Sequence, residues 1–265
     1  RDGFLVAAVF WLGLGSFGAI PLLLAQVPEM SVTDAVFETV SGLTTTGATA
    51  LTGLDSLPRS ILYYRAQLHW LGGMGIIVLA VAILPMLGVG GMQLYRAETP
   101  GPMKDSKLTP RITETAKALW LIYLGLSAAC TLAFWMAGMG LFDAVCHSFA
   151  TMGTGGFSTH DASMAWFNSP RIEGVAIAFM FLAGANFSLH FVVWRSRSLG
   201  AYARDPEFRA YFLILLTLTL IGTASLTITG HYPTVLESAR HAAFHFVSFM
   251  TSTGFIATGF DQWPG

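Results

Sequence analysis

The sequence predicts an all-α membrane protein built from a repeated unit of about one hundred residues. Hydrophobic residues make up 54% of the 265 residues and charged residues only 11%, whereas a soluble domain carries about 25% charged residues. So little charge would leave a soluble surface short of polar cover, and burial in a membrane is therefore predicted. A Thr/Gly-rich stretch also interrupts the apolar sequence three times, at 41–51, 150–159 and 249–258.

Long apolar segments are candidates for helices that cross the membrane. A helix needs roughly 20 mainly apolar residues to span a hydrocarbon core of about 30 Å. The segments that reach or approach this length are 4–25, 61–87, 113–136, 172–194 and 208–229.

Shorter, half-apolar stretches lie between these segments, at 31–43, 141–151 and 234–250. They are too short or too mixed to span, and they suit buried or re-entrant helices. Each runs directly into one of the Thr/Gly stretches. The predicted order is therefore long helix, short helix, loop and long helix, repeated along the chain.

The three loops align on a Thr-Gly pair, with spacings of 108 and 99 residues between Thr46-Gly47, Thr154-Gly155 and Thr253-Gly254. This alignment predicts two and a half repeats: 1–91, 113–197 after a cytoplasmic linker at 92–112, and an incomplete third at 198–265. The chain has no initiator methionine and stops just after the third loop, so we expect it to be an excerpt of a longer protein.

The basic residues predict the orientation in the membrane. Ten of the fourteen lie on one side of the predicted spans, which should be cytoplasmic; they are Arg1, Arg96, Lys104, Lys107, Arg111, Lys117, Arg195, Arg197, Arg204 and Arg209. The Thr/Gly loops lie on the other side. This arrangement fits loops that dip into the membrane from outside.

The Thr/Gly loops are predicted to line an ion path, with plain connecting turns as the alternative. Irregular backbone at membrane depth must be buried in protein or line a watery cavity. Glycine lets successive carbonyl groups turn to one side, and threonine adds hydroxyl oxygens while its branched side chain stiffens the backbone. Rings of such oxygens can replace the hydration shell of a monovalent cation. Each short helix would also point its partly negative C-terminal end at the ion.

The alternation of outer helix, short helix, loop and inner helix resembles the Trk/Ktr/HKT superfamily of potassium uptake proteins. Within the superfamily, the bacterial Trk-type membrane subunit is the most similar branch. The stretch "QLHWLGGMGIIVLAVAILPMLGVGG" (67–91) looks like the first inner helix of that family, and "FMFLAGANFSLHF" (179–191) looks like the second. The stretches "GTGGFST" and "TSTGF" look like its second and third filters, so the resemblance covers essentially the whole chain.

The resemblance implies potassium uptake through a selectivity filter, with four pseudo-symmetric repeats around one pore. It implies no organic cofactor, and potassium is the only ligand expected. A serine at the glycine of the first filter accompanies sodium permeation in plant relatives, so glycine at this position favours potassium. Carried over position by position, the predicted filter residues are Thr45, Thr46, Gly47, Gly153, Thr154, Gly155, Ser252, Thr253 and Gly254.

The resemblance also implies partners and a location. It implies a homodimer in which each protomer has its own pore, and a cytoplasmic nucleotide-binding regulatory subunit that docks on the basic loops at 92–117 and 195–209. The expected location is the plasma membrane, as a multi-pass protein of the bacterial inner membrane. The net charge of −1 argues against a nucleic-acid-binding protein.

Three other functions stay open at this point. One is a sodium-permeable channel of the same architecture, and another is a remnant that transports nothing. An intramembrane enzyme ranks far below both, because no HExxH or GxSxG motif occurs in the sequence.

Ionisable residues in the apolar segments are functional candidates by default. Arg65 is predicted either to serve the transport function or to pair with an acid such as Glu38. His147 and His245 lie in two of the short helices, and structural hydrogen bonding is favoured over proton coupling. "GLGSFG" at 13–18 fits a dinucleotide-binding pattern, but it lies within an apolar segment, so close helix packing is predicted instead.

Overall fold

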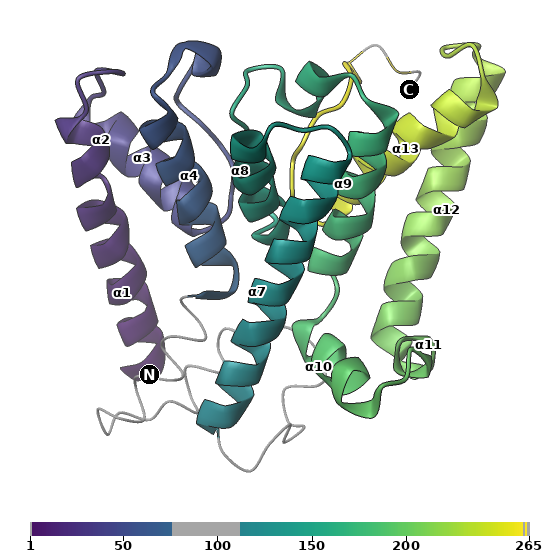
Figure 1. Cartoon of the computed structure of the whole chain (residues 1–265), viewed down its shortest axis with the longest axis horizontal. Helices are drawn as coiled ribbons and strands as arrows, with labels where there is room; N and C mark the ends of the chain where they lie inside the picture. The colour runs from purple at the N-terminus through teal and green to yellow at the C-terminus, as the bar shows by residue number, and fades with distance from the viewer. Residues whose placement is uncertain (1, 76–111, 262, 264–265) are drawn as a thin grey trace.

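The computed structural model of the chain (Figure 1) describes residues 2–75, 112–261 and 263. Every long regular element in these ranges is a helix, which confirms the predicted all-α fold. Residues 76–87 of the predicted first inner helix and nearly all of the predicted linker at 92–112 lie outside the described residues. The predicted boundaries between repeats stay predictions.

The first repeat follows the predicted order of helices. Ser31 caps the short helix by accepting the backbone N–H of Asp34 at 3.1 Å, which satisfies an otherwise free donor at the helix start. A 3-10 turn at Leu54–Ser56 precedes the inner helix. The elements are an outer helix formed by α1 (Asp2–Gly18) and α2 (Ile20–Leu24), the short α3 (Val32–Leu43), and an inner helix formed by α4 (Arg59–Trp70) and a π-helical turn (Leu71–Gly75).

The second and third repeats have the same order. The second contains α7 (Ile112–Met136), the short α8 (Leu141–Met152), and an inner helix formed by α9 (Pro170–Ala183) and α10 (Phe187–Ser196). The third contains α11 (Gly200–Arg204), the long α12 (Pro206–Ile228) and the short α13 (Val235–Met250). The recurrence of outer helix, short helix and loop confirms the repeated architecture.

The segment predicted as one span at 172–194 is a bent pair of helices and not one continuous helix. The axes of α9 and α10 differ by 92°. At the bend, Ala185 donates its backbone N–H to Leu182, three residues back, so the α-helical pattern is broken. Asn186 then starts α10 by accepting the N–H of Ser188 at 3.0 Å.

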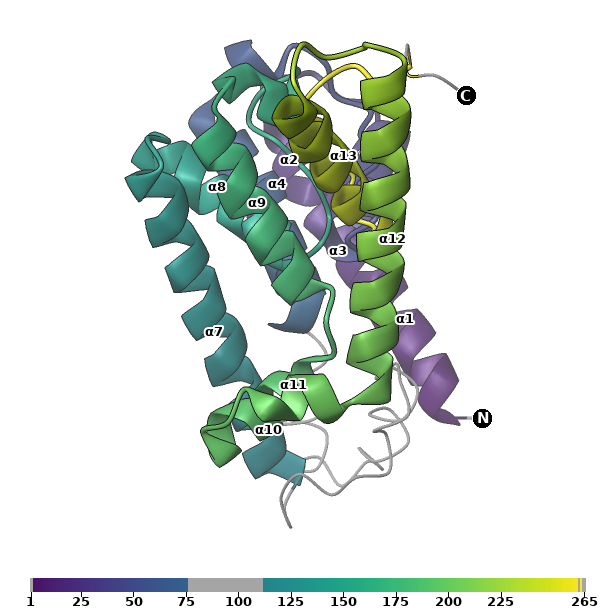
Figure 2. The same cartoon turned by 90° about the vertical axis from the view of Figure 1, so that its right-hand side faces the viewer.

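Two described helices are long and apolar enough to cross a bilayer, Lys117–Met136 and Pro206–Ile228. The bent pair would provide a third span, and Trp11–Leu24 is an apolar helix of shorter length. Figures 1 and 2 show the long helices α7 and α12 running along the vertical direction, while the short helices α3, α8 and α13 lie in the upper half of the molecule. The short helices therefore enter from one side without crossing, as predicted.

The ends of the molecule differ in chemistry. The elements α10 and α11 lie at the lower end, opposite the connections that leave the short helices (Figure 2). Arg195, Arg197 and Arg204 lie on or next to these two helices. These three of the ten basic residues therefore lie at the end away from those connections, and five of the others lie outside the described residues.

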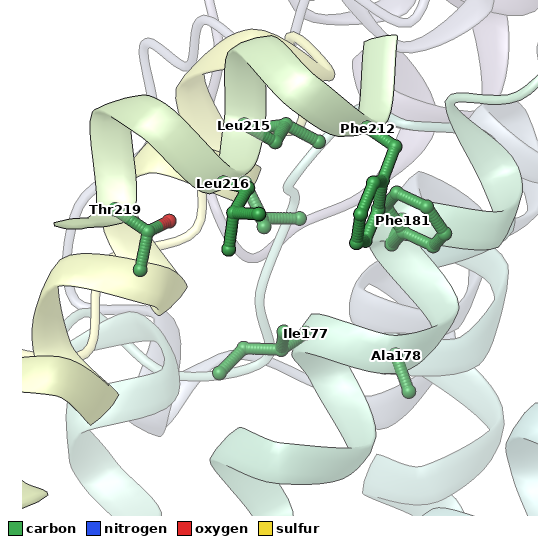
Figure 3. Close-up of a pocket in the computed structure, with 8 residues that line it drawn as sticks. Ile177, Ala178, Phe181, Phe212, Leu215, Leu216 and Thr219 are labelled. Carbon is green, nitrogen blue, oxygen red and sulfur yellow. The ribbon is translucent and has the colours of Figure 1, made fainter. Parts of the chain in front are cut away.

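The outer face of α12 is apolar and suits contact with lipid. Only 11% of its hydrophobic window is buried inside the molecule, and an exposed apolar face of this size is rare on soluble proteins. Beside it lies an apolar groove with a volume of about 260 Å³ between α9 and α12 (Figure 3). The groove is lined by Ile177, Ala178, Phe181, Phe212, Leu215, Leu216, Thr219 and Val247.

Glycines let α1 pack closely on α3. A β-carbon on Gly15 would lie 2.6 Å from Cγ2 of Val40, and one on Gly18 would lie 2.6 Å from Cγ2 of Thr39. Both distances are too short for a real side chain. The "GLGSFG" motif therefore serves helix packing, as the sequence predicted.

We expect Gly15→Ala to lower the free energy of unfolding by about 1–3 kcal/mol, because the added methyl group overpacks the contact with Val40. Gly13→Ala is the matched control, because no described atom lies within 4 Å of its β-carbon position. Thermal unfolding of the intact protein in detergent measures both. Equal melting temperatures for the two variants would contradict the close α1–α3 contact.

Candidate ion-binding filter

The three short helices end in the same way. The residue after each helix still donates its N–H four residues back, and the next residue donates three residues back. That second residue has a left-handed backbone conformation in all three loops, which is uncommon for residues other than glycine. These residues are Thr45, Thr154 and Ser252, with φ angles of 54°, 52° and 58°.

The next two positions fix the register of the loops. The first donates its N–H five residues back, as Thr46 does to Ser41 at 2.9 Å, and the second is a glycine with positive φ. The donors are Thr46, Gly155 and Thr253, and the glycines are Gly47, Gly156 and Gly254, with φ angles of 77°, 74° and 77°.

The predicted alignment was wrong by one residue in the second loop. The helix end sets the register, and it places Thr154, Gly155 and Gly156 opposite Thr45, Thr46 and Gly47. Gly153 is instead equivalent to Thr44 and Thr251, which cap the other two helices. The Thr154-Gly155 pair suggested a false match, because the second loop has a glycine where the other two have threonine.

The loops lie side by side. A β-carbon on Gly47 would overlap the carbonyl oxygen of Gly155, and one on Gly156 would overlap the carbonyl oxygen of Thr253. The first loop therefore contacts the second through the same pair of positions that the second uses to contact the third. No described atom lies within 4 Å of a β-carbon on Gly254, so this side of the third loop is open.

The carbonyl oxygens of the loops are available to a ligand. In the part of the chain that the structure describes, no hydrogen bond ends on a carbonyl oxygen of 45–47, 154–156 or 252–254. Main-chain oxygens away from water normally have a partner. The next carbonyl in the first and third loops is already bonded, because Ser41 donates to Ala48 and Ser248 donates to Phe255, at 2.6 and 2.8 Å.

Threonine hydroxyls stiffen two of the loops. The hydroxyls of Thr44 and Thr46 lie 2.8 Å apart, and those of Thr251 and Thr253 lie 2.7 Å apart. The second loop has glycine at both equivalent positions. The described residues hold no cluster of three or more His, Cys, Asp or Glu side chains that could bind a metal ion.

In each repeat, one buried side chain of the short helix bonds the extended segment that follows the loop. This side chain lies seven residues before the left-handed residue. Glu38 accepts the backbone N–H of Ala50 at 2.9 Å. His147 Nε2 bonds the Ser158 hydroxyl at 3.0 Å, and His245 Nε2 lies 3.2 Å from the carbonyl oxygen of Thr258. The hydrogen bonding predicted for the two histidines is confirmed. Their equivalence to Glu38 was missed because the residue types differ.

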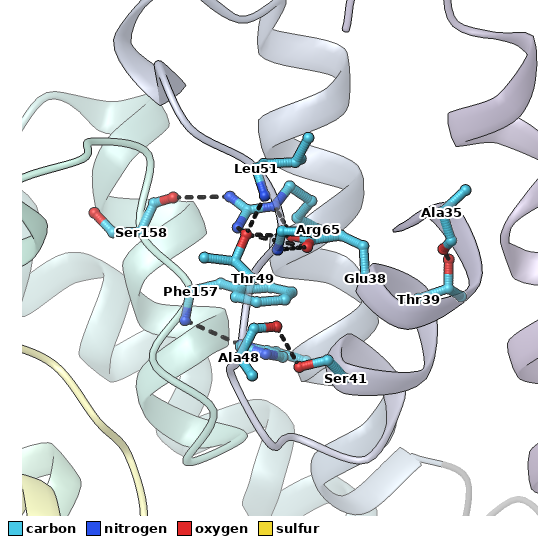
Figure 4. A network of polar contacts seen from close by, with 12 residues as sticks. Ala35, Glu38, Thr39, Ser41, Ala48, Thr49, Leu51, Arg65, Phe157 and Ser158 are labelled. Carbon is cyan, nitrogen blue, oxygen red and sulfur yellow. Dashed lines mark hydrogen bonds and ion pairs between the residues drawn. The ribbon is translucent and has the colours of Figure 1, made fainter. Parts of the chain in front are cut away.

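Arg65 joins the first and second loops (Figure 4). Its side chain is 1% exposed, and its Nε donates to the fully buried Glu38 at 2.6 Å. Its two terminal nitrogens donate to the Thr49 hydroxyl at 3.0 Å and to the carbonyl oxygen of Ser158 at 3.1 Å. The guanidinium also lies 4.2 Å from the ring centroid of Phe157, a favourable cation–π contact. The predicted pairing of Arg65 with Glu38 is confirmed.

A second contact joins these loops nearer the outer surface. His160 Nδ1 bonds the carboxylate of Asp55, whose other oxygen lies 3.4 Å from the backbone N–H of Asp161. The His160 ring stacks on Trp166 with centroids 4.2 Å apart. The bond from His160 lowers the pKa of Asp55. The contribution of this carboxylate to stability is therefore complete above its unfolded pKa and is lost only as the pH falls below that value.

Comparison with known proteins gives a consistent family. A family model described as a cation transport protein, TrkH, matches residues 1–265. The chain is 60% identical over 265 residues to the Trk system potassium uptake protein TrkH of Halomonas elongata. It is 55% identical to the TrkH protein and 42% identical to the TrkG protein of Escherichia coli K12, over 264 residues each.

A solved structure agrees with these relatives. The crystal structure of the potassium transporter TrkH from Vibrio parahaemolyticus matches with a TM-score of 0.84 and 50% sequence identity, over all of this chain and 53% of that one. The alignments with the Halomonas and Escherichia proteins also cover the whole chain. The chain spans 54–55% of the length of these curated relatives.

We expect Glu38→Gln and Arg65→Met each to lower the free energy of unfolding by about 3–5 kcal/mol, because each leaves one buried charge without its partner. Arg59→Met is the matched control on α4, where the guanidinium lies at an exposed position over Phe142.

A double-mutant cycle on the melting of the intact protein measures the coupling between the two residues. The Glu38→Gln/Arg65→Met double variant should lose clearly less than the sum of the single losses. Additive losses would show that the two charges do not stabilise each other.

Proposed function

The chain belongs to the TrkH family of cation transport proteins, and from that membership we propose that it forms most of a potassium-conducting pore for uptake across the membrane. Members of this family are transporters, which sets aside the enzyme alternative raised by the sequence. The observation that carries the proposal is that three equivalent loops lie side by side with unbonded carbonyl oxygens.

The proposed filter ligands are the oxygens of three equivalent triplets: 45–47, 154–156 and 252–254. In this set Gly156 replaces Gly153 of the initial prediction, because the backbone register places Gly156 with the other two left-handed glycines. Each triplet follows a short helix, whose C-terminal end carries partial negative charge. A cation at this point would exchange its hydration water for oxygens held in place by the strands behind them.

Potassium is proposed over sodium on two grounds. Glycine occupies the third position of all three triplets, and relatives 42–60% identical are named potassium uptake proteins. The close approach of Gly47 to Gly155 leaves no space for a side chain, so the separation of the loops depends on that glycine. A sodium-permeable pore of the same architecture is the second candidate, and reversal potentials in mixed potassium and sodium distinguish the two.

We propose that a fourth loop completes the filter in the intact protein. The side of the third loop beside Gly254 has no neighbour among the described residues, and the relatives are nearly twice as long as this chain. A fourth loop that met Gly254 as the second loop meets Gly47 would close the ring.

The partners and location carried over from the resemblance are part of this proposal. The intact protein would be a homodimer in a bacterial inner membrane, with several spans in each protomer. A cytoplasmic nucleotide-binding subunit would dock on the basic surface that includes α10 and α11. Charge reversal at Arg195 and Arg197 should then reduce co-purification of that subunit.

Gly47→Ser in the intact protein should reduce rubidium uptake by roughly tenfold or more and weaken discrimination against sodium, because the side chain displaces the Gly155 carbonyl from the ion path. Gly53→Ser is the matched control. Gly53 also has a left-handed φ, of 71°, but the nearest atom to its β-carbon position is 3.6 Å away.

Uptake is measured in cells that lack their own potassium transport systems. The control should keep most of the wild-type uptake and its ion preference. An unchanged ion preference in Gly47→Ser would contradict the assignment of this loop to the filter.

A further inference from the structure

The two inner helices depart from α-helical geometry within two residues of equivalent positions. In the first repeat, α4 ends at Trp70 and passes into the π-helical turn Leu71–Gly75. In the second, α9 ends at Ala183 and the chain bends by 92° into α10. Such departures leave main-chain groups that need other partners, and membrane lipid offers none.

A tyrosine from the outer helix of the following repeat donates its hydroxyl to a main-chain oxygen at both departures. Tyr123 of α7 donates its hydroxyl to the carbonyl oxygen of Trp70 at 3.0 Å, and Tyr211 of α12 donates to that of Phe181 at 3.1 Å. The tyrosine rings also stack on the side chains of Trp70 and Phe181, with centroids 5.8 and 5.1 Å apart. The two contacts are thus the same structure, used twice.

At the second departure, the freed carbonyl group can be identified. In an unbroken helix, Phe181 would accept the backbone N–H of Ala185. That N–H instead bonds Leu182 at 3.2 Å. The Tyr211 hydroxyl therefore takes over a carbonyl oxygen that the bend has deprived of its donor.

A glycine three residues further on connects each departure to a filter loop. A β-carbon on Gly73 would lie 2.7 Å from the Tyr123 hydroxyl oxygen and 2.8 Å from Cα of Gly153. A β-carbon on Gly184 would lie 2.7 Å from the Tyr211 hydroxyl oxygen and 2.6 Å from Cγ2 of Thr251. Gly153 and Thr251 are the cap residues immediately before the second and third filter triplets.

We propose that Tyr123 and Tyr211 are positioning residues for the second and third filter loops. Each hydroxyl holds the inner helix at its departure from α-helical geometry, and the adjacent glycine backbone holds the cap residue from which the filter triplet begins. The ion never touches either tyrosine. This inference rests on the proposed filter, and it adds outer-helix residues that set the separation of the filter oxygens.

Tyrosine-to-phenylalanine variants of the intact protein test this role, because they keep the stacked ring and remove only the hydroxyl. Tyr64→Phe is the matched control. The Tyr64 hydroxyl also donates to a main-chain oxygen of another helix, that of Gly18 at 2.6 Å. This contact lies between α4 and α1 and involves neither of the two departures. Rubidium uptake is measured with and without competing sodium.

We expect the preference for potassium over sodium to fall by about fivefold in Tyr123→Phe and in Tyr211→Phe, the effect of losing one net hydrogen bond. Tyr64→Phe should keep the wild-type preference. Equal preferences in all three variants would overturn the proposal. So would a uniform fall in the amount of folded protein that left the preference unchanged.

A second measurement applies if either variant transports nothing. The stabilisation of the purified protein by potassium and by sodium is then compared through its melting temperature. Loss of the difference between the two ions in Tyr123→Phe or Tyr211→Phe supports the positioning role, and an unchanged difference overturns it. Failure of the wild-type protein to distinguish the ions in either assay would instead overturn the proposed filter itself.

Discussion

The fold depends on one constraint: main-chain oxygens at membrane depth need a partner, and those without one inside the protein must face water or an ion. Irregular backbone is tolerated there only where it is enclosed by protein or lines a path for water and ions. The three proposed filter triplets fit this condition, because the first two N–H groups of each bond back into the short helix, while no hydrogen bond among the described residues ends on their carbonyl oxygens. The surrounding structure holds those oxygens in one place.

The support behind the loops is not the same at each junction. Between the first and second loops, buried Arg65 bonds the strands on both sides. When Trp70 is aligned with Phe181, Arg65 aligns with Ala176 in the second repeat. Ala176 is fully buried in the main hydrophobic core. Buried ionic bonding therefore occupies this position at the first junction, while apolar packing that includes Phe255 and Met180 occupies it at the second, where the ion pair of Arg240 with Glu173 joins α13 to α9 instead. The tyrosine contact, in contrast, occurs at both inner helices.

Much of this fold was predictable from the sequence, because apolar length and composition dictate which helices suit a membrane. The short helices and their Thr/Gly loops were found to within a few residues. The bend at Gly184 was missed because the stretch around it stays apolar. The register of the second loop and the shared role of Glu38, His147 and His245 were missed for a related reason. Both depend on backbone geometry, which different residue types satisfy equally well.

Diffraction from crystals of the intact protein that contain rubidium or thallium would test the central claim most directly, through anomalous scattering. The account predicts ion density between the loops, bounded by the carbonyl oxygens of 45–47, 154–156 and 252–254. Ion density elsewhere, with these oxygens hydrogen-bonded to other protein groups, would contradict it.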